Sequence, residues 1–233
     1  MKTKEPRIPN SCFHKLYKPD KSQFVCALKI NIHIKRMWGE YMIVFHMSNT
    51  LKPGMSFSSD YQNAFHLAMP FVQALEQSHD CFAALFLSAK YTWAVLDKFG
   101  MNSTFTDYSK WATEGVFEYV RKNEYPECCS RLTGNFFYDG QTNQDDLFDY
   151  VWGSCEDPHE KESVKFYAIE LDDSHPSKHD MLWFDEAYDL MEDPTAIDKV
   201  ITIARKYFSG EATEHPIWEL LSGRQATVLE ERT

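Results

Sequence analysis

Apolar residues recur at helical spacing in the first half of the chain and in short strand-like runs in the second half. The helical spacing predicts helices over 61–77, 81–98 and 107–123. Runs of branched and aromatic residues predict strands over 132–138, 164–171, 217–221 and 226–229. Because the long helices come first and the strands are scattered among shorter helices, the order favours an α+β fold over a doubly wound parallel sheet.

Turn-forming residues delimit the remaining elements. A strand is expected over 42–46, ending at His46, because serine, asparagine, proline and glycine follow it. A short helix is expected over 144–151. A longer one begins at Pro194 and runs to Phe208, since proline is favoured in the first turn. Residues 172–180 read as a polar loop.

The composition excludes several classes of protein. The 233 residues suffice for one domain with a real core. No apolar run approaches the ~20 residues that span a bilayer, and no segment reads as a secretory signal. The six cysteines form no CxxC pair and no framework spacing. We therefore expect a soluble, cytoplasmic protein with reduced thiols, without a membrane partner.

Charge is distributed unevenly along the chain. The net charge is −11, yet residues 1–60 carry ten Lys/Arg against four Asp/Glu, and the remainder carries fourteen against thirty-one. An acidic body argues against broad, non-specific binding to nucleic acid. Residues 1–41 read as a basic N-terminal arm, and whether the arm belongs to the domain stays open, because translation could also start at Met42. The domain itself is expected over 42–233.

One loop contains residues that could bind a metal. His175, His179 and Asp180 are near neighbours in the sequence, but a loop of this kind is more often solvated than metal-binding. P-loop, GxGxxG, HExxH and GxSxG motifs are all absent from the sequence. We therefore expect no metal site.

Three polar residues interrupt apolar segments. His46 ends the first strand, Arg131 enters an apolar strand, and Glu219 lies inside an apolar run near the C-terminus. A buried, unpaired arginine is costly, so Arg131 must find an acceptor. Each residue also has a plainer interpretation, namely a structural histidine, an ion pair at a helix end and a solvent-facing glutamate on an edge strand.

Taken in order, these segments resemble the ADP-ribosyltransferase superfamily. The segments are VFHMSNTLKPG, GNFFYDGQTNQDDLFDY and IWELLSGRQATVLE. The helix FEYVRKNEYPECCSRL leading into FFYD also looks like an uncharacterised bacterial family, the DUF2441 group, thought to share this fold. The resemblance implies a split β-sheet core, with the helices of 61–124 as an insertion.

The same resemblance implies the roles of individual residues. Glu219 would be the catalytic carboxylate, and Arg131 would assist it, as in bacterial DNA-modifying toxins. The NAD-binding residues would be His46, Ser48, Ser130, Tyr138 and Tyr150, with His46 on the ribose and a tyrosine ring stacked on nicotinamide. This arrangement requires His46, Arg131 and Glu219 to converge on one cleft with a tyrosine nearby.

The implied function is NAD-dependent ADP-ribosylation of a macromolecule, with NAD as substrate and no metal. The acceptor, protein or nucleic acid, stays open. A role as a toxin of a toxin–antitoxin or phage-defence system, with an antitoxin protein as partner, is one expectation. Two alternatives remain: an NAD glycohydrolase on the same fold, and a non-enzymatic acidic module that binds a partner through the helices of 61–124.

Overall fold

The computed structural model describes residues 41–58, 62–99, 108–141, 143–153, 155, 157–173 and 175–232. The basic arm expected over 1–41 therefore falls almost entirely outside the described residues. Within the described residues, no helix combines the length and the apolar character needed to cross a membrane.

Seven antiparallel strands form one sheet in the order β2-β7-β4-β1-β3-β6-β5. Their bounds are β1 Met42–Ser48, β2 Ser56–Phe57, β3 Asn135–Tyr138, β4 Lys165–Leu171, β5 Ser177–Asp180, β6 Trp218–Ser222 and β7 Ala226–Arg232. Every residue of β1 pairs with β4, whereas β1 and β3 share the single pair Phe45 and Tyr138. The sheet thus consists of a four-stranded and a three-stranded half joined at one position.

The two faces of this sheet bury different clusters. Directly opposed residues of antiparallel strands point to the same side, so Phe45, Tyr138 and Glu219 share one face. We call this the helix face, because helices pack on it. The opposite face, here the loop face, carries Val44 and Phe137 and is packed by side chains of the β1–β2 segment.

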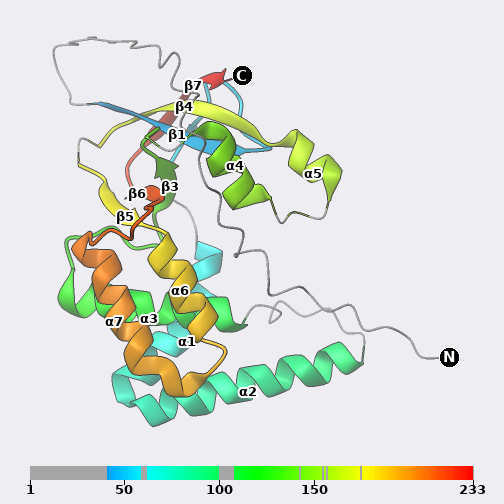
Figure 1. Cartoon of the computed structure of the whole chain (residues 1–233), viewed down its shortest axis with the longest axis vertical. Helices are drawn as coiled ribbons and strands as arrows, with labels where there is room; N and C mark the ends of the chain where they lie inside the picture. Colours follow the sequence, from blue (N-terminus) through cyan, green and yellow to red (C-terminus); the bar gives the residue numbers. More distant parts are fainter. Residues whose placement is uncertain are drawn as a thin grey trace.

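Five helices pack together beside the three-stranded half, as Figure 1 shows. They are α1 Gln62–Gln77, α2 His79–Lys98, α3 Tyr108–Glu124, α6 Leu182–Leu190 and α7 Ile197–Ser209. Their buried residues form one cluster that includes Leu221 of β6. The predicted helical insertion therefore shares its core with the C-terminal half of the chain.

A glycine allows the closest helix contact in this bundle. A Cβ at Gly115 of α3 would lie 2.7 Å from Cβ of Phe71 and 3.0 Å from the carbonyl oxygen of Ala68, both on α1. Only hydrogen at this position lets the two backbones approach so closely. The contact fixes α1 against α3, the most buried of the helices.

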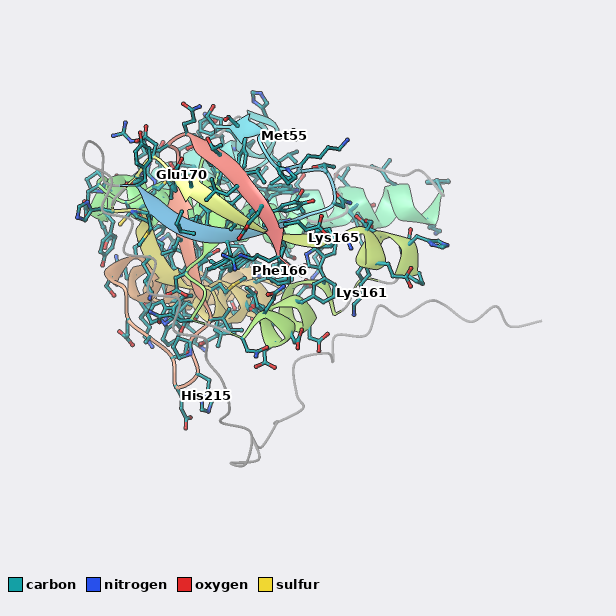
Figure 2. The ribbon with its side chains drawn as sticks, turned by 90° about the horizontal axis from the view of Figure 1, so that it is seen from above. Met55, Lys161, Lys165, Phe166, Glu170 and His215 are labelled. Atoms are coloured by element: carbon teal, nitrogen blue, oxygen red, sulfur yellow. The ribbon has the colours of Figure 1, made fainter. Side chains whose placement is uncertain are left out.

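Two shorter helices lie beside the four-stranded half. Helix α4 spans Gln144–Trp152, and α5 spans Pro158–Ser163. The side chain of Asn143 caps α4 by accepting the backbone N–H of Asp145 at 2.8 Å. In Figure 2, seen from above, the strands cross over the helices, and His215 points away at the tip of the α7–β6 loop.

Most predicted elements are confirmed, and one is wrong. The three long helices, the helix after Pro194, and the strands β1, β3, β4, β6 and β7 lie where expected. The predicted loop over 172–180 instead contains β5, which pairs with β6. Helices α5 and α6 were not predicted. Strand β5 reads Ser-Lys-His-Asp, so its burial rests on hydrogen bonds rather than on an apolar pattern.

Candidate functional site

Arg131 lies in the turn before β3 and points into the helix bundle. Its Nε and Nη2 donate to the two carboxylate oxygens of Glu114 on α3 at 3.1 and 3.2 Å. Its Nη1 donates to Tyr207 at 2.9 Å and to Oε1 of Glu219. The acceptor that the sequence required for this arginine is thus a pair of carboxylates, and Glu114 lies within α3 rather than at its end.

Glu219 lies on β6 and is almost completely buried, with 2% of its surface exposed. Both hydrogen bonds that its side chain accepts go to one oxygen. Oε1 accepts the hydroxyl of Tyr207 at 2.6 Å and the guanidinium of Arg131. Among the described residues, no hydrogen bond to Oε2 is seen. One oxygen is therefore fixed and the other is available.

Aromatic rings enclose the guanidinium of Arg131. Its carbon lies 4.0 Å from the ring centre of Phe184, 5.0 Å from that of Phe136 and 5.3 Å from that of Tyr207. Ring faces attract cations, most strongly where water is excluded. The rings and the carboxylates together hold this arginine in one orientation.

Negative charge exceeds positive charge around Arg131. Burial raises the pKa of Glu219, and Arg131 only partly opposes this effect. Burial also acts to lower the pKa of Arg131, but Glu114 and Glu219 outweigh it and the pKa rises. Asp185 on α6 is a third acid beside the same arginine, and burial raises its pKa to about 7. The guanidinium of Arg131 therefore interacts with three carboxyl groups, those of Glu114, Glu219 and Asp185.

A row of polar side chains crosses three adjacent strands on the helix face. Tyr138 of β3 is opposite Glu219, and Glu219 is opposite His179 of β5. The His179 ring stacks on Tyr207 with 4.3 Å between centroids, and its Nδ1 donates to the Tyr207 carbonyl at 2.9 Å. Burial lowers the pKa of His179 to about 4, so the ring is neutral near pH 7.

The expected convergence of three residues on one cleft is not observed, because His46 lies on the other face of the sheet. Its ring packs against Phe137 and Phe57 on the loop face, and its Nδ1 donates to the carbonyl of Phe136 at 2.7 Å. Alternation along β1 places Phe45, not His46, on the side of Glu219. A bound nucleotide could not use His46 and Glu219 from the same side of the sheet.

Ser48 and Ser130 are engaged in local hydrogen bonds. Ser48 is on the loop face with His46, and its hydroxyl accepts the backbone N–H groups of Thr50 and Leu51 in a turn. The hydroxyl of Ser130 donates to Glu118 at 2.7 Å. The predicted NAD contacts of both serines remain predictions. Neither hydroxyl bonds the cluster formed by Arg131, Glu219 and the side chains around them, here called the Glu219 cluster.

The two tyrosines predicted to hold nicotinamide lie on the strand and helix that flank the cluster. Tyr138 is buried directly opposite Glu219, and burial raises its pKa. Tyr150 lies on α4, whose Leu147 packs in the same cluster as Tyr138. Of the predicted residues, the structure therefore brings Arg131, Glu219 and Tyr138 together.

The loop residues considered as metal ligands do not form a site. His179 is buried against Tyr207, and both oxygens of Asp180 accept hydrogen bonds from the segment 213–217 or from Leu182. Across the described ranges, no three His, Cys, Asp or Glu side chains are placed to hold one ion.

A pocket of 480 Å³ lies at the end of β6, next to the Glu219 cluster. Its lining includes Cys129, Asp173, Ser177, Leu221 and Arg224. Cys129 is two residues from Arg131, and Leu221 is two residues from Glu219 on the same face of β6. Burial raises the pKa of Cys129 to about 11, so its thiol stays protonated near neutral pH.

Sequence reasoning missed four members of this cluster: Tyr207, Glu114, His179 and Asp185. Two of them carried a signal. Tyr207 continues the apolar stripe of its helix, and Glu114 interrupts the buried stripe of α3. A carboxylate on an apolar stripe indicates a buried partner. His179 was considered only as a metal ligand, and Asp185 carried no signal, because neither β5 nor α6 was predicted.

The chain matches a family of known sequences. Residues 41–232 match the model of the family described as "Protein of unknown function (DUF2441)". No curated protein sequence matches the chain.

Proposed function

The chain belongs to the DUF2441 family, and we propose that it is an NAD-dependent ADP-ribosyltransferase with Glu219 as its catalytic carboxylate. The proposal rests on the resemblance of the segments around Tyr138 and Glu219 to that superfamily, and the position of His46 on the opposite face of the sheet counts against it. Membership of a family of unknown function neither supports nor opposes it.

The state of the Glu219 carboxylate carries the proposal. Arg131 and Tyr207 hold Oε1, and no hydrogen bond from the described residues to Oε2 is seen. A carboxylate preorganised in this way is suited to stabilise positive charge that develops on a substrate. A solvent-facing glutamate on an edge strand, the plainer interpretation, does not match this environment.

In the proposed reaction, Oε2 of Glu219 stabilises positive charge on the ribose and then accepts a proton. The bond between ribose C1′ and the nicotinamide nitrogen breaks, and nicotinamide leaves with the electron pair. Positive charge develops on the ribose, where an anionic oxygen stabilises the transition state more than the ground state. The acceptor then forms its bond to C1′ and gives up a proton, which Oε2 of Glu219 can take.

Burial sets a condition on this chemistry. Glu219 exposes only 2% of its surface, so side chains around it must move when NAD binds. The pocket lined by Cys129 and Leu221, close in sequence to Arg131 and Glu219, is one space from which a ligand could enter. His46 would bind no part of NAD that Glu219 also reaches, and the proposal does not use it.

The acceptor and the biological role are further proposals. We retain a macromolecular acceptor and a toxin role, with an antitoxin protein as a possible class of partner. Expression in bacteria tests the role: growth arrest by the wild type that Glu219→Gln abolishes would support it, and equal growth of both strains would oppose it.

One observation favours a non-enzymatic interaction module instead. Helix α2 exposes two large apolar side chains, Leu87 at 53% and Tyr91 at 72%. Such residues mark interaction surfaces when they cluster. This alternative predicts no binding of NAD.

Incubation of the purified chain with NAD distinguishes the candidates. Nicotinamide release with ADP-ribose attached to macromolecules indicates a transferase, and release with free ADP-ribose indicates a glycohydrolase. A thermal-shift titration with NAD is an independent readout, because a ligand that binds only the folded state raises the melting temperature. If nicotinamide is not released and NAD does not raise the melting temperature, the non-enzymatic interaction module is the remaining candidate.

The matched control for Glu219→Gln is Glu170→Gln. Glu170 lies on β4 of the same sheet, is half-buried, and is labelled in Figure 2. It lies outside the Glu219 cluster. The control should retain whatever activity the wild type has.

A further inference from the structure

Tyr207 is the most completely enclosed tyrosine of the cluster. It lies on α7 with no exposed surface. Its ring contacts Phe117 at 5.2 Å and Phe208 at 4.8 Å between centroids, and His179 stacks on it. Together with the hydrogen bond from His179 to its backbone carbonyl, these contacts leave the ring one orientation.

This orientation directs the hydroxyl at the carboxylate. The Tyr207 hydroxyl accepts a hydrogen bond from Nη1 of Arg131 at 2.9 Å and donates its own proton to Oε1 of Glu219 at 2.6 Å. Since Arg131 can only donate, the proton of this hydroxyl has Oε1 as its acceptor. Tyr207 thus binds both members of the ion pair.

We propose that Tyr207 is a positioning residue, whose hydroxyl fixes Oε1 of Glu219 so that Oε2 alone faces the substrate. This inference rests on the proposed function for its kinetic consequence, but not for the hydrogen bond itself. No substrate contact is assigned to Tyr207, because its ring is enclosed.

The inference has a consequence that a purely structural tyrosine lacks. A donor to an ionised carboxylate favours the ionised form, so loss of the hydroxyl raises the pKa of Glu219. In Tyr207→Phe the ring contacts remain and only this hydrogen bond is lost. The acid limb of the kcat profile should then move to higher pH.

Several other ionisable groups face Glu219 and must stay constant in the comparison. They are Arg131 in the turn before β3, Glu114 on α3, Tyr138 on β3, His179 on β5 and Asp185 on α6. None of them changes in Tyr207→Phe, so a shift of the limb reports the hydroxyl.

The experiment compares three proteins: wild type, Tyr207→Phe and the control Tyr167→Phe. Tyr167 is also buried, and its hydroxyl donates to the carbonyl of Leu51 at 2.8 Å on the loop face. For Tyr207→Phe we expect kcat for NAD to fall about 10- to 100-fold, the range for a hydrogen bond to a charged group. KM should change little, and the acid limb should rise by about one pH unit. The control Tyr167→Phe should leave kcat, KM and the acid limb unchanged.

An unchanged kcat and an unchanged acid limb in folded Tyr207→Phe would overturn the inference. A measurement that does not depend on enzymatic activity tests the role of Tyr207 separately from the proposed function. Carbon-13 NMR titration of the Glu219 carboxyl, assigned with Glu219→Gln, follows its pKa directly. If the wild type is inactive, the proposed function fails, and the titration still decides: a higher pKa in Tyr207→Phe supports the hydrogen bond, and an equal pKa contradicts it.

Discussion

Arg131 and Glu219 form a buried ion pair across 88 residues of sequence, and the same arginine binds Glu114 through both of its carboxylate oxygens. The pair joins the turn before β3 to β6, while Glu114 joins it to α3. The arginine is therefore where the three-stranded half of the sheet meets the helix bundle. The predictions below separate its structural consequences from its chemical ones.

Removing the charge of Arg131 should destabilise the fold strongly. Arg131→Met leaves Glu114 and Glu219 buried without their cation, and breaking such a pair costs about 3–5 kcal/mol. The exposed pair Arg205 and Glu124 is the control, because an exposed ion pair contributes at most about 1 kcal/mol. Urea denaturation of Arg131→Met and Arg205→Met measures the loss in free energy of unfolding for each variant. Equal losses would contradict the view that Arg131 anchors the core.

A conservative change at Arg131 tests its chemistry. Lysine keeps the charge but cannot reproduce the planar fork that binds Glu114 through two nitrogens. If the proposed function holds, Arg131→Lys should remain folded and lose at least about tenfold in kcat, because Glu219 loses a fixed partner. A wild-type rate in the nicotinamide-release assay would reduce Arg131 to a structural residue.

Asp185 should make the protein less stable as the pH rises from about 4 to about 7. Burial raises the pKa of Asp185 to about 7 in the folded state, from 3.8 without the fold. Between these values the folded state binds the extra proton, so the free energy of unfolding falls as pH increases. Asp185→Asn removes this dependence and should be more stable than wild type at pH 8, by up to about 4 kcal/mol for a pKa raised from 3.8 to about 7.

Melting temperatures of wild type and Asp185→Asn at pH 4 and pH 8 check this prediction. The difference between the two proteins should be small at pH 4, where Asp185 is protonated in the folded state. His179 contributes the opposite slope, because its lowered pKa makes the fold lose stability as the pH falls from 6.5 to about 4. That slope is common to both proteins and cancels in the comparison.

Gly115→Ala should destabilise the protein although alanine is the better helix former. The gain in helix propensity is about 1 kcal/mol. The added methyl would meet Phe71 and a backbone carbonyl of α1 at distances that force the helices apart. Overpacking of this kind costs about 1–3 kcal/mol. A Gly115→Ala variant more stable than wild type in urea would contradict the close packing of α1 on α3.

Periodicity predicted the elements whose burial is apolar. The stripe of α3 and the branched run of β4 bury their side chains by hydrophobic contact, and both were located from spacing alone. Strand β5 could not be found in this way. Its buried residues, His179 and Asp180, are stabilised by hydrogen bonds to residues 28 to 37 positions later in the chain.

The candidate site was predictable in part for the same reason. The need of a buried arginine for an acceptor predicted a partner for Arg131 but not which one, and only the family resemblance placed Glu219 near it. Glu114, which binds Arg131 through both carboxylate oxygens, was not predicted. The face occupied by His46 depends on strand register, because a shift of one residue moves a side chain across the sheet. Register is set here by the β1–β4 ladder, which no local pattern in β1 reveals.

Glu219→Gln is the most direct test of the account. The burial of Glu219 makes alanine unsuitable, since it would leave a cavity beside Arg131, whereas glutamine keeps the shape. With Glu170→Gln as control, Glu219→Gln should remain folded by circular dichroism and lose nicotinamide release from NAD by at least about a hundredfold, as for removal of a preorganised electrostatic group. Release at the wild-type rate by folded Glu219→Gln would contradict the proposed role of Glu219.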